Sequence, residues 1–111
     1  MTKLERILHT LDDKKATNIV VMDLSDVELI HDKMVIASVN NPRLLNALKD
    51  YVIQDLAKDG YEIHHFEGND ESDWLLIDVF DIVVHLFLDE SRLHYSLDRL
   101  WADKIMIGDQ K

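Results

Sequence analysis

Residues 74–88, WLLIDVFDIVVHLFL, decide the fold of this chain. Apolar side chains fill most of both halves of this stretch, which Asp78 and Asp81 interrupt near its middle. Two such runs with almost nothing between them predict a β-hairpin. Leu75, Ile77 and Val79 share one face of the first strand with aliphatic side chains alone, so we expect that face to lie against the hydrophobic core.

The turn of the hairpin sets which residues lie opposite each other. With Val79 and Phe80 as the two turn residues, Asp78 is paired with Asp81. Two like charges directly opposite each other destabilise a sheet by up to about 1 kcal/mol. We expect a nearby cation such as Arg92, or a cationic partner, to offset this cost.

The second face of the hairpin is mixed in character. Besides the two aspartates it carries Trp74 and His85. One interpretation is that these side chains form a surface for a partner. The other is that the C-terminal helix covers the face, so that Trp74 and His85 only pack against it. Strand alternation alone leaves both interpretations open.

Local signals outside the hairpin predict helices and further strands. Thr2 and Glu5 have the spacing of a capping box at a helix start. Asn41 followed by Pro42 indicates a second helix, and Gly60 is placed to end it. The expected elements are a helix from Thr2 to Leu11, buried strands at 19–22 and 34–37 with a helical turn at 25–28 between them, a helix over 42–59, strands over 61–66, 74–79 and 81–88, and a helix outlined by Leu93, Leu97, Leu100 and Trp101.

This order mixes long crossovers with a hairpin. It predicts an α/β fold with a mixed sheet of about five strands and helices packed on it. With 111 residues the chain fits a single domain over 1–111. The charged segment from about residue 104 is expected to be a loose tail.

The composition excludes several classes of function. Twelve basic and 22 acidic residues give a formal net charge of −10, which disfavours direct binding to nucleic acid and favours a basic protein partner. No cysteine is present for a disulfide or a thiolate metal site. No apolar run approaches the ~18 residues of a membrane span, and the charged N-terminus is unlike a signal peptide. A soluble cytoplasmic domain is the class that remains.

Motifs of catalysis are mostly missing. Three glycines at 60, 68 and 108 do not make a phosphate loop, and the six histidines lack the helical spacing of a metal site. We therefore expect no cofactor and no metal. The competing hypothesis is a degenerate enzyme, either nucleotidyltransferase-like or a phosphohydrolase, in which Asp78 and Asp81 hold Mg²⁺.

The chain resembles the ribosomal silencing factor family, also called Iojap-like, over roughly residues 2–103. The upstream half agrees with the family pattern in its first helix, in both buried strands and in Arg43 at the start of a helix. The signature itself is carried by Glu67-Gly68, by Ser72-Asp73-Trp74-Leu75-Leu76-Ile77-Asp78, by Asp81-Ile82-Val83-Val84-His85, by Glu90-Ser91-Arg92, by Tyr95 and by Leu100-Trp101.

The resemblance implies a bacterial translation repressor and not an enzyme. Family members bind ribosomal protein fourteen of the large subunit and block its association with the small subunit. Their fold is related to that of nucleotidyltransferases but lacks the catalytic acidic motif. The residues that match the family pattern, and are expected to bind the partner, are Trp74, Asp78, Asp81, His85, Arg92, Tyr95 and Trp101.

Within this set, Trp74 and Tyr95 are the expected apolar anchors, and Asp78 and Asp81 would pair with basic side chains of the partner. An exposed Trp74 face could also pair with a second copy of the chain, giving a homodimer off the ribosome. The chain departs from the family pattern at Phe80, where the family has glycine, and at Lys33 and Val39.

Overall fold

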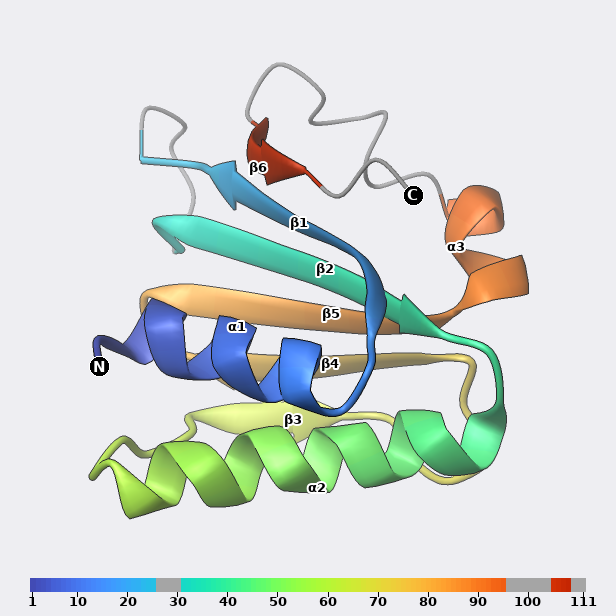
Figure 1. Cartoon of the computed structure of the whole chain (residues 1–111), viewed down its shortest axis with the longest axis horizontal. Helices are drawn as coiled ribbons and strands as arrows, with labels where there is room; N and C mark the ends of the chain where they lie inside the picture. Colours follow the sequence, from blue (N-terminus) through green and yellow to red (C-terminus); the bar gives the residue numbers. More distant parts are fainter. Residues whose placement is uncertain (26–30, 96–104, 109–111) are drawn as a thin grey trace.

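A mixed six-stranded sheet forms the centre of the molecule, with strand order β3-β4-β5-β2-β1-β6 (Figure 1). In this computed structural model the described backbone covers residues 1–25, 31–95 and 105–108, and the described side chains end at residue 92. The elements are α1 (Lys3–Asp13), β1 (Thr17–Asp23), β2 (Lys33–Val39), α2 (Pro42–Lys58), β3 (His65–Glu67), β4 (Trp74–Val79), β5 (Ile82–Leu88), α3 (Asp89–Tyr95) and β6 (Ile105–Gly108).

β2 and β5 lie in the middle of the sheet and pair in parallel, whereas the other neighbours pair antiparallel. All seven residues of β5 are buried, as are six of the seven in β2. Strands buried on both faces read as continuous apolar runs rather than as alternating ones. The prediction of a mixed sheet in one α/β domain is confirmed.

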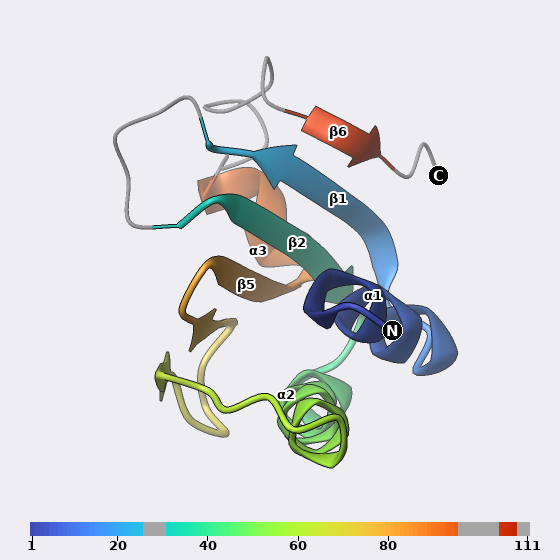
Figure 2. The same ribbon diagram turned by 90° about the vertical axis from the view of Figure 1, so that its left-hand side faces the viewer.

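One face of the sheet is covered by α1 and α2, which lie together on the same side (Figure 2). The capping box of Thr2 and Glu5 forms as predicted, and the Asn41 side chain accepts a hydrogen bond from the Leu44 amide at 2.7 Å. Gly60 follows α2 with a φ of +85°, the left-handed conformation that ends a helix. The helices bury a core of aliphatic side chains that includes Leu75, Ile77, Val79, Ile82, Val84 and Leu86 of the hairpin.

A second apolar cluster lies on the opposite face of the sheet. Met34, Ile36 and Phe87 belong to it, and Trp74 and Leu76 pack against it partly buried. The order of side chains along β4 and β5 therefore follows the predicted alternation, with the aliphatic face toward the helices. The sheet separates two cores, and Trp74 lies on the side away from α1 and α2.

The predicted register of the hairpin is wrong. The turn residues are Phe80 and Asp81, so that Asp78 lies opposite Val83 and no two aspartates face each other. Val79 is fully buried and completes the core face of β4, which prevents it from serving as a turn residue. Phe80 takes the positive φ of the turn, +69°, instead.

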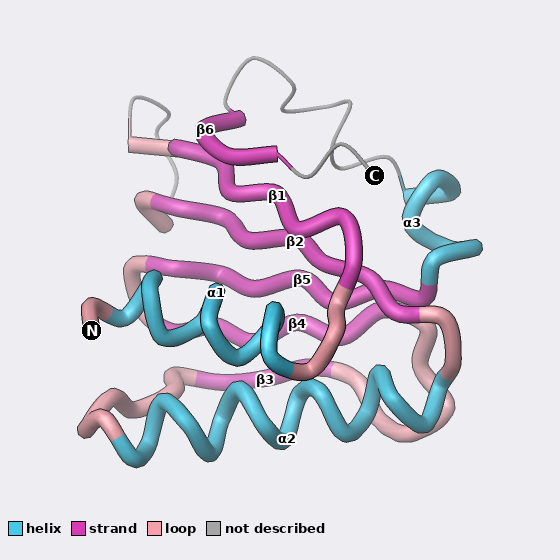
Figure 3. The backbone as a smooth tube through the Cα atoms, in the orientation of Figure 1, coloured by secondary structure: helices cyan, strands magenta, loops and turns pink. Residues whose placement is uncertain are grey.

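Two other predictions are corrected. The strand expected over 61–66 is shorter and later, because Tyr61 and Ile63 pack against the helical core and only β3 joins the sheet (Figure 3). The tail expected to be loose from residue 104 contains β6, whose apolar Ile105 and Ile107 pair with β1. The turn expected at 25–28 and the final helix beyond α3 lie largely outside the described residues.

Gly68 is the glycine whose missing side chain the fold requires. It has a φ of +113°, and a Cβ atom there would lie 2.2 Å from Leu75 Cδ2. We expect Gly68→Ala to lower the free energy of unfolding by about 2–3 kcal/mol, through strain and overpacking. Gly60→Ala is the control, because its Cβ would meet nothing within 4 Å, and only the left-handed φ of +85° should cost about 1 kcal/mol. Equal losses in urea denaturation would contradict this account.

Candidate protein-binding face

The candidate site is the side of the hairpin that faces away from α1 and α2. We call it the Trp74 face; it consists of Trp74, Leu76 and Asp78 on β4 and of Val83, His85 and Phe87 on β5. The face mixes aromatic and titratable side chains, whereas the opposite side is aliphatic. Strand alternation alone produces this separation, because successive side chains point to opposite sides of a sheet.

Trp74 is held in place by two neighbours on β5. Its indole Nε1–H donates a hydrogen bond to His85 Nδ1 at 2.9 Å. Its ring stacks on Phe87, with centroids 5.1 Å apart and an interplanar angle of 27°. Since Nδ1 accepts this bond, a neutral His85 carries its proton on Nε2. Trp74 itself is half-buried, so it is neither a solvent-exposed anchor nor a core residue.

Burial keeps His85 neutral. The residue is only 6% exposed, and this desolvation, with a smaller contribution from the charge of His31, lowers the pKa of His85 to about 4. A side chain buried to this degree does not reach a partner directly. Its contribution to the Trp74 face is the acceptor that it offers to the indole.

Asp78 is held by groups of its own chain. Its Oδ1 lies 3.1 Å from His31 Nε2, in an ion-pair contact without hydrogen-bond geometry, and accepts a hydrogen bond from the Phe80 amide at 3.0 Å. Burial raises the pKa of Asp78, but the His31 contact and the Phe80 amide outweigh it and leave the pKa below its ordinary value. His31 is thus the basic neighbour of Asp78, and the like-charge pair that Arg92 was expected to offset does not form.

Asp81 has a different basic partner. Lys3 Nζ lies 2.6 Å from its Oδ1 and also donates to the Val79 carbonyl at 3.0 Å. The Lys3 hydrogen bond lowers the pKa of Asp81. The contact joins the hairpin turn to the first turn of α1. Each of the two carboxylates therefore has a basic neighbour of its own, His31 for Asp78 and Lys3 for Asp81. Within the described residues no group of three His, Cys, Asp or Glu side chains could hold a metal ion.

Arg92 lies away from the aspartates. It is 8% exposed, follows the far end of β5 and donates from Nη1 to Ser38 Oγ at 3.2 Å. The seven residues of β5 span roughly 20 Å, so the expectation that Arg92 orients the aspartates is wrong. Tyr95 ends α3, but its side chain and the whole of Trp101 lie outside the described part of the chain.

Sequence reasoning missed His31 and Lys3. Both make their contacts across long stretches of chain, 47 residues from His31 to Asp78 and 78 from Lys3 to Asp81. Local periodicity in the sequence does not predict contacts between residues so far apart along the chain. Sequence reasoning also missed the place of Glu67 beside the Trp74 face, although the Glu67-Gly68 dipeptide before the β4 segment was noted as part of the family signature.

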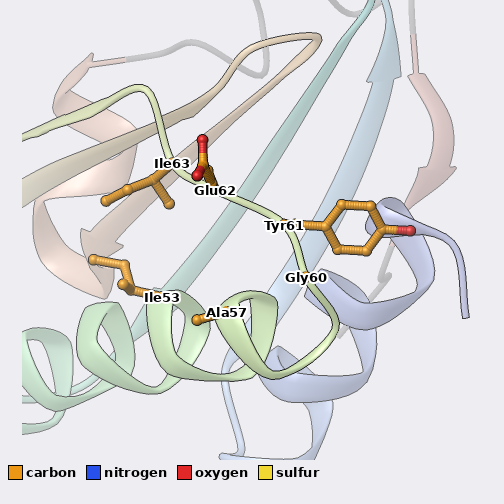
Figure 4. A pocket seen from close by; sticks show the side chains of 6 residues that line it. All are labelled: Ile53, Ala57, Gly60, Tyr61, Glu62 and Ile63. Atoms are coloured by element: carbon orange, nitrogen blue, oxygen red, sulfur yellow. The ribbon is translucent and has the colours of Figure 1, made fainter.

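Two hollows lie near these elements. The larger, about 520 Å³, lies between the end of α2 and the segment that follows it (Figure 4). The smaller, about 270 Å³, adjoins the Trp74 face and is lined, among the described residues, by Glu67, Gly68, Trp74 and Leu76. The larger one has Glu62 as the only charged side chain in its described lining.

The neutrality of His85 predicts a loss of stability in mild acid. Its pKa is lower in the folded than in the unfolded chain, so the stabilisation is complete above pH 6.5 and is lost as the pH falls toward 4. The fall from 6.5 to about 4 corresponds to about 3 kcal/mol. Urea denaturation at several pH values checks this. His85→Gln should flatten the profile between pH 6.5 and 4.5, and exposed His9→Gln should not. A wild-type profile that is flat over this range would contradict the assignment.

The whole chain matches a known family. The family model described as "Ribosomal silencing factor during starvation" covers residues 1–111. The ribosomal silencing factor of Halalkalibacterium halodurans is 33% identical over 100 residues, which are 90% of this chain and 86% of that protein. That of Haemophilus influenzae is 33% identical over 102 residues, 92% of this chain and 100% of the relative. These names describe a regulatory factor and indicate no catalytic activity.

A more distant relative and two crystal structures are also similar to this chain. The mouse protein named "Mitochondrial assembly of ribosomal large subunit protein 1" is 30% identical over 104 residues, 89% of this chain and 45% of that protein. A crystal structure from Chromobacterium violaceum is similar with a TM-score of 0.83 and 30% identity, covering 100% of this chain and 98% of that one. Another, from Bacillus halodurans, is similar with a TM-score of 0.79 and 32% identity, covering 88% of this chain and 91% of that one. The resemblance noted in the sequence is thereby confirmed, and the chain belongs to the ribosomal silencing factor family, whose members are ribosome-associated regulators of translation.

Proposed function

We propose that this chain represses translation by binding a basic protein of the large ribosomal subunit, ribosomal protein fourteen, and so blocks joining of the small subunit. Membership of the silencing factor family supports a ribosomal target. The name of the mouse relative refers to the large subunit, which supports that subunit as the one bound. A factor with this role acts in the cytoplasm. Among the described residues no helix has the length and hydrophobicity to cross a bilayer.

The observation that carries the proposal is the way Trp74 is presented. A half-buried tryptophan, stacked on Phe87 and hydrogen-bonded to His85, lies on the side of the sheet away from α1 and α2. Its position is set before any partner arrives, so binding costs little side-chain entropy. Tryptophans held in this way are frequent energetic centres of protein interfaces.

The charge around Trp74 fits a basic partner. The end of β3 exposes Glu67, and the loop that leads from it into β4 exposes Asp70 and Glu71. These carboxylates lie within a few residues of Trp74, and the whole chain carries a net charge of −10. Complementary charge speeds the encounter with a basic surface and suppresses contacts with RNA. We propose this acidic loop as part of the docking surface.

The roles of the other expected partner residues change. His85 is buried and acts on the interface through Trp74. Asp78 and Asp81 already contact His31 and Lys3 of their own chain, so their direct pairing with the partner is no longer favoured. Tyr95 and Trp101 remain predicted partner contacts, outside the described side chains.

The enzyme hypothesis has lost its main support. It needs Asp78 and Asp81 together at a Mg²⁺ ion, but each is paired with a basic group on a different element. A homodimer off the ribosome remains a prediction. Sedimentation velocity of the purified chain tests it directly.

Trp74→Ala should abolish binding to isolated large subunits. Loss of an interface anchor costs on the order of 2–4 kcal/mol, a weakening of roughly thirty-fold or more. Because Trp74 is half-buried, the free energy of unfolding should also fall, by about 2 kcal/mol, and leave the domain folded at 25 °C. Co-sedimentation with the large subunit, and subunit joining followed on sucrose gradients, give the two readouts.

Tyr51→Ala is the matched control, since Tyr51 is a 38% exposed aromatic residue on α2, in the layer on the other side of the sheet. It should bind and block joining like the wild type. A folded Trp74→Ala chain that still blocks joining would remove the proposed function from the Trp74 face.

A further inference from the structure

The smaller hollow lies on one side of the Trp74 indole. Strand order places β5 on one side of β4 and β3 on the other. Phe87, opposite Trp74 on β5, covers the side of the indole toward β5. The hollow is lined by Glu67, at the end of β3, by Gly68 and by Leu76, so it lies on the β3 side. Trp74 therefore both stacks on Phe87 and lines the hollow.

The groups around this hollow fit a flat cation with an apolar stem. Leu76 and the indole supply apolar surface, and the indole N–H is already engaged by His85, so the ring offers its π surface rather than a donor. Glu67 stands at the rim with its side chain 66% exposed and supplies a carboxylate. A guanidinium stacks on aromatic rings and binds a carboxylate through two parallel hydrogen bonds.

Gly68 helps to form the hollow. Its φ of +113° bends the chain directly after β3, and its lack of a side chain allows the close approach to Leu75. The volume, about 270 Å³, is below the ~300–1,000 Å³ of ordinary small-molecule sites and suits one long side chain.

We propose that this hollow receives an arginine side chain of the protein partner, with the guanidinium against the Trp74 indole and paired with the Glu67 carboxylate. The inference rests on the proposed function and names the partner chemistry at that surface. His65 Nε2 lies 3.4 Å from Glu67 Oε2 and carries a charge only when protonated, so an arriving guanidinium displaces a weak, exposed contact. A lysine ammonium would pair with Glu67 but lacks the planar group that matches the indole.

The first experiment uses small probes on the isolated chain. N-acetyl-arginine amide at millimolar concentration should shift the indole N–H resonance of Trp74, assigned by its absence in Trp74→Phe. Glu67→Gln should remove the shift, and N-acetyl-lysine amide should produce a clearly smaller one. Equal shifts from both probes, or none from arginine, overturn the assignment of arginine.

The second experiment uses large ribosomal subunits. Glu67→Gln should weaken binding about fivefold, the upper range for an exposed ion pair. Glu62→Gln is the matched control, because Glu62 is an exposed glutamate that lines the other hollow, and it makes the same change in net charge. It should leave affinity unchanged. Equal weakening by both variants would mean that only the overall acidic charge matters, and would overturn the inference.

The two proposals fail in different ways. If Trp74→Ala loses binding while Glu67→Gln binds like the wild type, the hollow is not used and the proposed function stands. If both variants bind and block joining like the wild type, the Trp74 face is not the docking surface, and the inference falls together with the proposed function.

Discussion

The parallel pairing of β2 with β5 is the constraint on which the rest of the structure depends. Seven consecutive pairs, from Lys33 opposite Ile82 to Val39 opposite Leu88, place two buried strands at the centre of the sheet. Strands of this kind need apolar cover on both faces. α1 and α2 cover one face, and the cluster around Ile36 and Phe87 fills the other. The molecule thus has a helical side and a second side, on which Trp74 lies.

The hydrogen bond between Trp74 and His85 links that architecture to the proposed binding function. A buried imidazole is tolerated because it stays neutral and has a donor aimed at its Nδ1. In return the indole is fixed against Phe87 at the border of the hollow that Glu67 also lines. Folding energy and the geometry of the docking surface therefore depend on the same contact, so substitutions at His85 are expected to affect both.

Much of the fold could be predicted from local sequence patterns, and the site only in part. The caps at Thr2 and Asn41 and the alternation around Trp74 are local signals, and the structure bears them out. The predicted hairpin register was wrong because it used Val79 as a turn residue, whereas the burial of Val79 keeps it in β4 and moves the turn to Phe80 and Asp81. His31 and Lys3, the basic residues that contact the two aspartates, come from distant segments, which no pattern in the hairpin reveals. The placement of Trp74 and His85 on one face was predictable. The stacking of Trp74 on Phe87, its direct partner across the hairpin, depends on a register that was not.

The central claim is that the Trp74 face, and not the helical layer, docks on the large subunit. An electron cryo-microscopy reconstruction of this chain bound to isolated large subunits tests it most directly. The account predicts that Trp74 and the loop carrying Glu67 and Glu71 lie against a basic ribosomal protein, with α1 and α2 turned away from it. A complex in which α1 and α2 contact the subunit and the Trp74 face points into solvent would contradict it.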